Sequence, residues 1–530
     1  MKKLRTLVAL ASLALFVDSS TLMAVCSAHP AAKKTKPAAK PVIAPLPAPI
    51  EPGQPYFQPS HRLLGIGLDR QTMSSSVLDA RTKNAIAAQA FSILRDPRSI
   101  GWAKACTDPK LQAIFDKAIV GVDFPKAILE GIAFVESGCY PNAKSPSGAA
   151  GIMQIIAKTA GSMGLRIGHE TKTRLIPQRK LVKRGTKTTP PVYKDLPPKK
   201  EKYREVVDER FDPEKAIPAA ARYLAGLAGR YGGVDFAVWA YHSGEGRIGS
   251  VRKLIKKYNI SDATVPVVFF GNTPAWRKDL YDLIQKDEAK DFGPTYYFCV
   301  KQAGQLLAAY RLSPKPFEAL ARKYANPVKP DERAPNRLWV WYSPKDMYRN
   351  NNDLEVATDK NLVSVPQWPK FFSYSLRTFG AESIGEKDPE HRRLFLQDPP
   401  EVVGALEYVA FETRRFWEAT HPKKEKFIPL EVTALVRNVD YQQLLAQNPN
   451  SHTAFPTHCI GAVDISYLRL PKWEAQALQF VIQDMGWDEY LGYFLESKSR
   501  ETIHFGTSPS HKDFFISVYK EAKSYAIPKQ

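Results

Sequence analysis

Cysteine and long apolar segments are both scarce in this sequence. Only five cysteines occur among 530 residues, and one apolar run stands near the start of the chain. So few cysteines exclude a disulfide-rich scaffold, and their spacing matches no zinc finger. The chain also lacks an aromatic RNA-binding motif and a basic heptad region. Beyond the first residues no segment is apolar over the length needed to cross a bilayer, which excludes a protein with several membrane spans.

The start of the chain predicts export. Residues 1–28 begin with three basic residues, continue with the apolar run 7–17 and end in small residues, as a secretory signal peptide does. Cys26 faintly resembles the cysteine of a lipoprotein box, but Val25 is unfavourable before it, so lipid anchoring there is the less favoured alternative. We expect an exported protein whose membrane contact is peripheral or absent.

The net charge and the next segment point to an acidic partner. The formal net charge is +21 and the sequence pI is about 9.5. Residues 29–62 are rich in Pro, Ala and Lys and cannot bury enough apolar surface to fold, so we expect an extended tether. In an exported protein, acidic cell-wall polymers and peptides fit this charge better than nucleic acid.

Residues 123–154 predict a candidate catalytic acid. Asp123 is a plausible N-cap, and the helical pattern that follows ends at Ser137 and Gly138. Glu136 lies on the buried stripe in the last turn, where desolvation and the helix dipole both raise the pKa of a carboxyl group. Such a group suits general acid catalysis. The alternative is an ordinary buried helix with a satisfied glutamate.

A run of small residues follows this helix. Residues 148–151 carry minimal side chains, so a bulky ligand could approach the backbone closely there. Met153 and Gln154 then offer a soft apolar surface and an amide. Cys106 and Cys139 flank the same helix, and they form either a disulfide or two buried thiols.

Three ordered motifs resemble those of a known family. Glu136-Ser137-Gly138 followed by the sequence GIMQI resembles the signature of the soluble lytic transglycosylases of bacterial cell-wall metabolism. Residues 241–248 resemble that family's Tyr-Asn-Ala-Gly-x-Gly-x-Val motif, with His242 in place of Asn. Tyr296 resembles the tyrosine near the end of the domain, although Tyr297 beside it could take its place. The resemblance implies an all-α, goose-lysozyme-like fold.

The resemblance also implies the chemistry. Glu136 would protonate the oxygen between N-acetylmuramic acid and N-acetylglucosamine and then accept the proton of the muramic 6-hydroxyl, so a 1,6-anhydro sugar forms without water. Glu130 and Glu245 are unconvincing as a second carboxylate. His242 can replace one amide hydrogen bond but not both. The residues expected to bind the glycan or orient Glu136 are Ser137, Met153, Gln154, Tyr241, His242 and Tyr296. The alternative is a hydrolytic, lysozyme-type muramidase.

A basic insertion departs from the family pattern. Residues 166–202 are rich in Lys, Arg and Pro and show no apolar periodicity, which predicts a surface loop. It could guide an anionic glycan or partner, or it could be a solvated loop without a specific role.

The last third of the chain predicts a second site. His458, Asp464 and His504 offer two imidazoles and a carboxylate, the donor set of a catalytic zinc. Glu501 precedes His504 in a Glu-x-x-His motif, in which the glutamate can act as catalytic general base for the metal-bound water. With Arg437 upstream as a substrate-binding residue, this order resembles the zinc D-alanyl-D-alanine carboxypeptidases and dipeptidases. The spacing from His458 to Asp464 is one residue shorter than in that family. His452 could therefore compete as a ligand, or the site could bind no metal.

We therefore predict a multidomain cell-wall enzyme that acts on glycan strands and stem peptides in the periplasm or outside the cell. An all-α transglycosylase domain is followed by a smaller α+β zinc peptidase-like domain, or by a non-catalytic wall-binding module. The expected divisions are signal peptide 1–28, linker 29–62, transglycosylase domain 63–325, unassigned linking region 326–388 and peptidase-like domain 389–530.

Overall fold

The computed structural model describes residues 49–61, 63, 73–185, 190–325, 341–342, 344–366, 374–376, 388–421, 425–447, 456–466, 470–496 and 502–525. The predicted signal peptide with Cys26, the alternative ligand His452 and the candidate base Glu501 lie outside the described residues. Among the helices that are described, none combines the length and apolar character needed to span a membrane.

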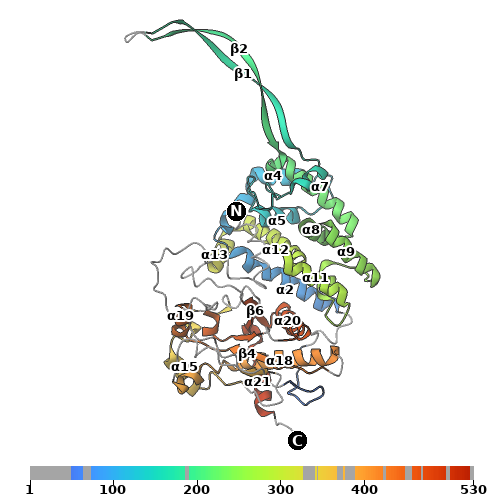
Figure 1. The fold of residues 1–530 in the computed structure, drawn as a ribbon, viewed down its shortest axis with the longest axis vertical. Helices are drawn as coiled ribbons and strands as arrows, with labels where there is room; N and C mark the ends of the chain where they lie inside the picture. Colours follow the sequence, from blue (N-terminus) through green and yellow to red (C-terminus); the bar gives the residue numbers. More distant parts are fainter. Residues whose placement is uncertain are drawn as a thin grey trace, which may run out of the picture.

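Residues 73–325 form the helical half that the sequence predicts (Figure 1). Its buried core includes Leu129, Ile132 and Trp239. Its helices are α2 (Ser75–Leu94), α3 (Ser99–Cys106), α4 (Pro109–Ala118), α5 (Lys126–Ser137), α6 (Ala157–Ser162), α7 (Pro213–Tyr231), α8 (Val234–Ser243), α9 (Glu245–Lys257), α10 (Val265–Phe270), α11 (Lys278–Asp291), α12 (Gly293–Leu312) and α13 (Pro314–Ala325), with a short 3-10 helix, η2 (Glu209–Phe211).

Two glycines bring α5 and α12 into close contact. A Cβ atom on Gly131 of α5 would lie 2.2 Å from the carbonyl oxygen of Val300, and one on Gly304 of α12 would lie 2.4 Å from that of Ala127. Any side chain at these positions would force the helices apart. The close packing brings the end of α5 next to the first turns of α12.

The start of α5 corrects one prediction. Asp123 is not the N-cap, because the helix begins at Lys126 and its N-cap is Pro125. Pro125 has an extended backbone conformation and provides no side-chain cap, so the helix starts directly after it. The predicted end is confirmed, since Gly138 caps α5 with a left-handed φ of 62°.

The basic insertion is a long β-hairpin, which corrects the prediction of a loop. Strands β1 (Ile167–Lys183) and β2 (Val192–Asp208) pair antiparallel and project from the helical half (Figure 1). All but one of the β1 side chains and most of the β2 side chains are exposed, and the half-buried ones of β2 lie in its C-terminal part. A strand without a buried face needs no apolar alternation, so the periodicity on which the prediction relied is absent.

The C-terminal half, residues 341–525, is an α+β structure as predicted. Its five-stranded sheet has the order β3-β4-β5-β7-β6. The strands are β3 (Tyr374–Leu376), β4 (Leu430–Ala434), β5 (Val463–Ser466), β6 (Leu491–Glu496) and β7 (Thr502–Thr507). The helices are α15 (Asn351–Asp359), α17 (Pro389–Leu394), α18 (Pro400–Thr420), α19 (Val439–Gln447), α20 (Lys472–Trp487) and α21 (Lys512–Ser524), with the 3-10 helices η4 (Pro344–Asp346), η5 (Pro456–Cys459) and η6 (Pro509–His511).

Two stretches outside the predicted peptidase-like domain belong to this half. Strand β3 comes from the unassigned region and pairs parallel with β4. The end of the predicted tether is also packed: Ile50 forms a backbone bridge with Phe427, and both Ile50 and Phe57 are buried. These apolar side chains anchor a segment whose average composition predicted a free linker.

Candidate active site

Glu136 lies in the last turn of α5 with its side chain only 14% exposed. The turn that follows is tightly constrained, because a Cβ atom on Gly138 would lie 2.4 Å from Trp102. Gly138 therefore provides both the left-handed conformation and the room that end the helix directly after Glu136. The sequence prediction of a sheltered carboxyl group at a helix end matches this position.

Tyr296 is the direct partner of this carboxyl group. Its hydroxyl donates a hydrogen bond of 2.7 Å to Glu136 Oε1 from the first turn of α12. Burial raises the pKa of Tyr296 well above its ordinary value, and the charge of Glu136 raises it further. The hydroxyl therefore keeps its proton and remains a donor. Tyr297, the alternative, packs its ring against Phe298.

His242 adds an imidazole to the same site. Its ring stacks on the Tyr296 ring with centroids 4.1 Å apart and an interplanar angle of 10°. Its Nδ1 atom lies 4.0 Å from Glu136 Oε1. Tyr241, which precedes it at the end of α8, donates a hydrogen bond of 2.7 Å to the carbonyl oxygen of Met153. Burial raises the pKa of Tyr241 well above its ordinary value, so this donor also stays neutral.

The other predicted residues hold the loop around Glu136. Ser137 is fully buried, and its hydroxyl donates to the carbonyl oxygens of Ala133 and Ile152. Met153 is also fully buried. The Gln154 amide donates to the carbonyl oxygens of Ala143 and Gly151, and Gln154 itself has a left-handed φ of 47°. These contacts are internal to the protein and fix the loop that receives the Tyr241 hydroxyl.

The small residues of this loop make room mainly for the protein itself. A Cβ atom on Gly151 would lie 1.6 Å from the carbonyl oxygen of Arg210, and Ala149 and Ala150 are buried. This corrects the expectation that the whole run is open to a ligand. Only Gly148 has no heavy atom of the described residues near its Cβ position.

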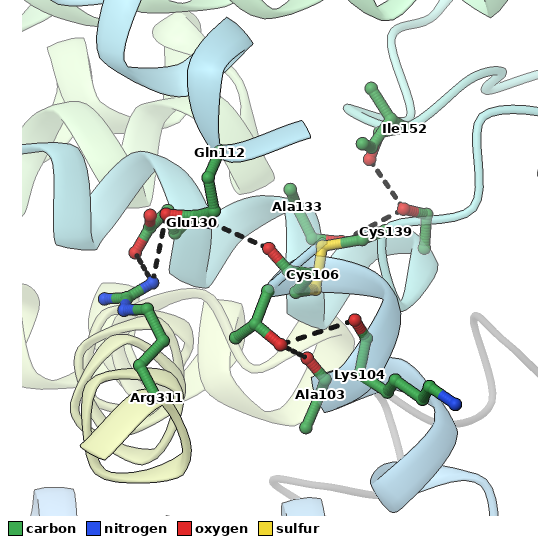
Figure 2. Close-up of a disulfide and its surroundings, with 11 residues drawn as sticks. Ala103, Lys104, Cys106, Gln112, Glu130, Ala133, Cys139, Ile152 and Arg311 are labelled. Atoms are coloured by element: carbon green, nitrogen blue, oxygen red, sulfur yellow. Dashed lines mark hydrogen bonds and ion pairs between the residues drawn. A yellow bond between two sulfur atoms is a disulfide. The ribbon is translucent and has the colours of Figure 1, made fainter. Parts of the chain in front are cut away.

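Neither alternative carboxylate is available beside Glu136. Glu130 is buried and binds Arg311 at 2.9 Å (Figure 2). Glu245 accepts a hydrogen bond from the Tyr223 hydroxyl at 3.0 Å and pairs with Arg230. Within the described part of the chain, both groups are therefore held by other partners.

A disulfide bond closes this region. Cys106 at the end of α3 and Cys139 directly after α5 are bonded, with Cα atoms 5.1 Å apart (Figure 2). The disulfide, one of two alternatives that the sequence left open, is thus the one formed. Cys139 has a left-handed φ of 63°, so the bond ties down the strained turn after Glu136.

The three predicted metal ligands also converge. Asp464 on β5 lies directly opposite His504 on β7, and His458 comes from η5 just before β5. Asp464 oxygens lie 2.9 Å from His458 Nε2 and 2.7 Å from His504 Nδ1. All three side chains are buried, and their candidate ligand atoms lie within 4.8 Å of one another. Because His458 lies in η5 and not in a strand, the shorter spacing does not direct its side chain away from Asp464.

The outer ring nitrogens of both histidines have partners. His458 Nδ1 faces the carbonyl oxygens of Leu435 and Ala462, and His504 Nε2 lies 2.9 Å from the Thr457 hydroxyl. Such contacts orient metal-binding histidines, so this donor set fits zinc. Thr457 was not predicted, and no sequence pattern marks it.

Within this cluster, the negative charge of Asp464 lies next to the positive charge of Arg437. Burial lowers the pKa of His458 to about 4, which keeps its imidazole neutral. Burial alone would raise the pKa of Asp464, but the adjacent His458 and His504 hold it below its usual range. Arg437, predicted to bind substrate, is buried with Nη2 3.6 Å from Asp464 Oδ2.

Comparison with known proteins finds similarity within the helical half. The profile of the Transglycosylase SLT domain matches residues 114–188 and 193–263. The chain is 33% identical to Peptidoglycan transglycosylase gp16 of Escherichia phage T7 over 138 residues, which are 26% of this chain and 8% of that protein. It is 29% identical to Membrane-bound lytic murein transglycosylase F of Shewanella pealeana over 180 residues, which are 34% of this chain and 28% of that protein.

The matched parts are a small share of these relatives, so the comparisons concern a domain rather than whole proteins. The matched region includes Glu136, the loop that follows it and Tyr241. It ends before Tyr296, which the structure brings to the same carboxylate. Within the helical half, residues 114–188 and 193–263 are therefore similar to the Transglycosylase SLT domain.

Proposed function

We propose that this chain is an exported peptidoglycan lytic transglycosylase. It would cleave the β-1,4 bond between N-acetylmuramic acid and N-acetylglucosamine and leave a 1,6-anhydro-muramic end. The observation that carries the proposal is a single partly sheltered carboxyl group, Glu136, bound to a neutral tyrosine donor. A lone carboxyl group suits a mechanism that uses it twice, whereas ordinary glycosidases use two.

In the first step the Glu136 carboxyl group gives its proton to the glycosidic oxygen while the bond from that oxygen to the anomeric carbon breaks. In the second step the muramic 6-hydroxyl bonds to the anomeric carbon, and its proton passes to the Glu136 carboxylate. The enzyme ends in its starting state and no water enters the product. The Tyr296 hydroxyl stabilises the carboxylate form between the two steps.

The test is mass spectrometry of the muropeptides released from purified sacculi. We expect Glu136→Gln to lower anhydro-product formation by at least about a hundredfold, the usual contribution of a general acid. Glu245→Gln is the matched control, because that carboxylate is bound to Tyr223 and Arg230 instead. Reducing, non-anhydro ends from the wild-type protein would instead assign a lysozyme-type hydrolase.

A second activity is proposed for the C-terminal half, namely zinc-dependent trimming of stem peptides. His458, Asp464 and His504 would hold the ion, which in such sites acidifies a bound water for peptide hydrolysis. The convergence of these three donors, with the outer nitrogens of both histidines bound to other groups, supports the assignment. Arg437 would compensate negative charge next to Asp464.

Metal analysis and peptide release test this second proposal separately from the first. We expect close to one zinc per chain in the wild-type protein and loss of it in His504→Ala, while anhydro products persist. His511→Ala is a suitable control, since His511 packs on Tyr490 outside the cluster. If the purified protein holds no zinc and chelators leave D-amino acid release unchanged, the C-terminal half is a binding module.

A further inference from the structure

The β1–β2 hairpin extends well beyond the rest of the helical half (Figure 1). Each strand has 17 residues, which gives a reach of roughly 50 Å. Its base is fixed, because Arg166 pairs with Glu209 and Arg210 donates to the carbonyl oxygens of Gly148 and Ile155. The distal part packs against no other element that the structure describes, so its surface is available to a partner.

The hairpin is basic, and three of its acidic residues pair with cations across the strands. Residues 167–208 contain twelve Lys or Arg and five Asp or Glu. Cross-strand ion pairs join Lys172 to Glu205, Arg174 to Glu201 and Arg179 to Asp195. The basic charge farther out is therefore not balanced within the hairpin.

The distal end places like charges opposite each other. Lys180 and Lys194 are directly paired across the strands, and Lys183 and Arg184 follow. All four are exposed, and none forms an ion pair with a described residue. Like charges at opposite positions destabilise a hairpin unless an anion lies between or above them.

Apolar side chains are exposed at the same end. Leu181 and Tyr193 lie opposite each other and are 42% and 53% exposed, and Val182 and Val192 are 62% and 53% exposed. Solvent-exposed apolar side chains in a projecting, unpacked hairpin indicate a surface that is covered in use. We call the residues Lys180–Arg184 and Val192–Lys194 the hairpin end.

We propose that the hairpin end binds the surface of a bilayer that contains anionic phospholipids. The lysines and the arginine would contact the lipid phosphates, and the aliphatic and tyrosine side chains would enter the interface between headgroups and acyl chains. An acidic wall polymer would satisfy the charges but leave the apolar residues exposed to water. The lipid surface accounts for both sets of residues.

This binding would fix the enzyme at a distance from the membrane. The hairpin base contacts the loop that follows Glu136, through Arg210 and the carbonyl oxygens of Gly148 and Ile155. A membrane-bound hairpin end would therefore hold the SLT domain roughly 50 Å from the bilayer.

Vesicle co-sedimentation of the full-length protein tests the proposal. We expect binding to vesicles of phosphatidylglycerol and phosphatidylcholine in equal parts, weak binding to pure phosphatidylcholine, and loss of binding at high salt. Lys180→Glu with Lys194→Glu, and separately Leu181→Asn with Tyr193→Asn, should each weaken binding at least about tenfold. Release of muropeptides from lipid-free sacculi should stay unchanged in both, which shows that the variants are folded.

Matched controls change the same chemistry elsewhere. Lys253→Glu with Lys256→Glu alters the charge equally on the exposed face of α9, and Val206→Asn alters an exposed apolar residue at the hairpin base. Both controls should bind like the wild-type protein. The proposal is overturned if the hairpin-end variants bind vesicles as well as the controls do. It is also overturned if the hairpin-end residues are needed for binding to sacculi while the wild-type protein does not bind anionic vesicles.

Discussion

At the residue scale, the Tyr296 hydroxyl donates a hydrogen bond of 2.7 Å to Glu136 Oε1. The tyrosine is fully buried, and the imidazole of His242 stacks on its ring. A neutral donor stabilises the carboxylate that forms after the first proton transfer without competing for that proton. In the proposed reaction, Tyr296 would therefore affect the rate more than the binding of the glycan.

Removing this hydroxyl should slow the reaction while leaving the fold intact. A hydrogen bond to a charged group contributes about 1.5–3 kcal/mol, so Tyr296→Phe should lower kcat about ten- to a hundredfold with little change in KM. Tyr297→Phe is the control, because its neighbouring ring packs against Phe298. Equal activities of the two variants in a sacculus assay would contradict the role given to Tyr296.

Glu474 makes stability depend on pH. It is fully buried on α20, and burial raises its pKa to about 8. The folded protein thus holds a proton that the unfolded chain loses near the ordinary pKa of glutamate. The contribution of Glu474 to stability is therefore fully present below that pKa and is lost as the pH rises toward 8. The slope from this group is at most about 1.4 kcal/mol per pH unit.

Glu474→Gln should remove this pH dependence, since glutamine resembles the protonated acid. We expect calorimetry to give a higher Tm than the wild-type protein at pH 8 and a similar Tm at pH 5. Glu355→Gln, at an exposed position of α15, should leave the wild-type slope in place. A wild-type Tm that rises steadily from pH 5 to pH 8, with no difference in Glu474→Gln, would refute this account.

The site could be predicted residue by residue only in part. Glu136, Tyr241 and Tyr296 could be predicted because each lies in a local motif and the sequence alone shows where the helix ends and in which order the motifs occur. The internal bonding of Ser137 and the burial of Met153 depend on which side of the loop faces the core, which spacing does not specify. Thr457 contacts His504 only because β5 and β7 pair.

At the scale of elements, the disulfide joins α3 to the end of α5. The bonded cysteines are 33 residues apart, and a loop of that length gives about 3–4 kcal/mol of stabilisation in the chain-entropy account. Because Cys139 follows Glu136 so closely, the bond also limits the positions that the carboxylate can take.

Replacing both cysteines by serine should therefore reduce stability and activity together. We expect the free energy of unfolding of the protein to fall by about 3–4 kcal/mol, measured by urea denaturation. Reductant should lower the stability of the wild-type protein toward that of the double variant and leave the variant unchanged. An unchanged urea midpoint after complete reduction would rule out this role.

The elements were predictable where burial imposes a period. The helices of the helical half follow from their apolar faces, and the end of α5 follows from Gly138. The hairpin could not be predicted in this way, because strands exposed on both faces show no apolar alternation. The packing of residues 49–61 could not be predicted either. Two buried apolar residues in a Pro-rich segment hardly change its average composition.

At the scale of the whole molecule, the two halves form a continuous structure. Arg81 of α2 is fully buried and pairs with Asp484 of α20, and its Nε donates to Asp488 at 2.7 Å. Trp487 packs its ring against Phe269 and Phe270 of the helical half. The interface combines buried charge with aromatic packing, so we expect the halves to unfold together.

Arg81→Ala should uncouple them. Leaving the buried Asp484 carboxylate without its partner costs about 3–5 kcal/mol, so the single calorimetric transition should move to lower temperature and separate into two. Arg322→Ala removes an exposed ion pair with Glu318 and should cost no more than about 1 kcal/mol. Retention of one transition at the wild-type temperature in Arg81→Ala would show that the interface does not depend on this residue.

The most direct test of the central claim is digestion of sacculi in water enriched in oxygen-18, followed by mass spectrometry of the released muropeptides. If Glu136 acts first as acid and then as base toward the muramic 6-hydroxyl, the new ends are 1,6-anhydro sugars that carry no heavy oxygen. Reducing ends labelled with oxygen-18 would contradict the account, because they require water as the nucleophile.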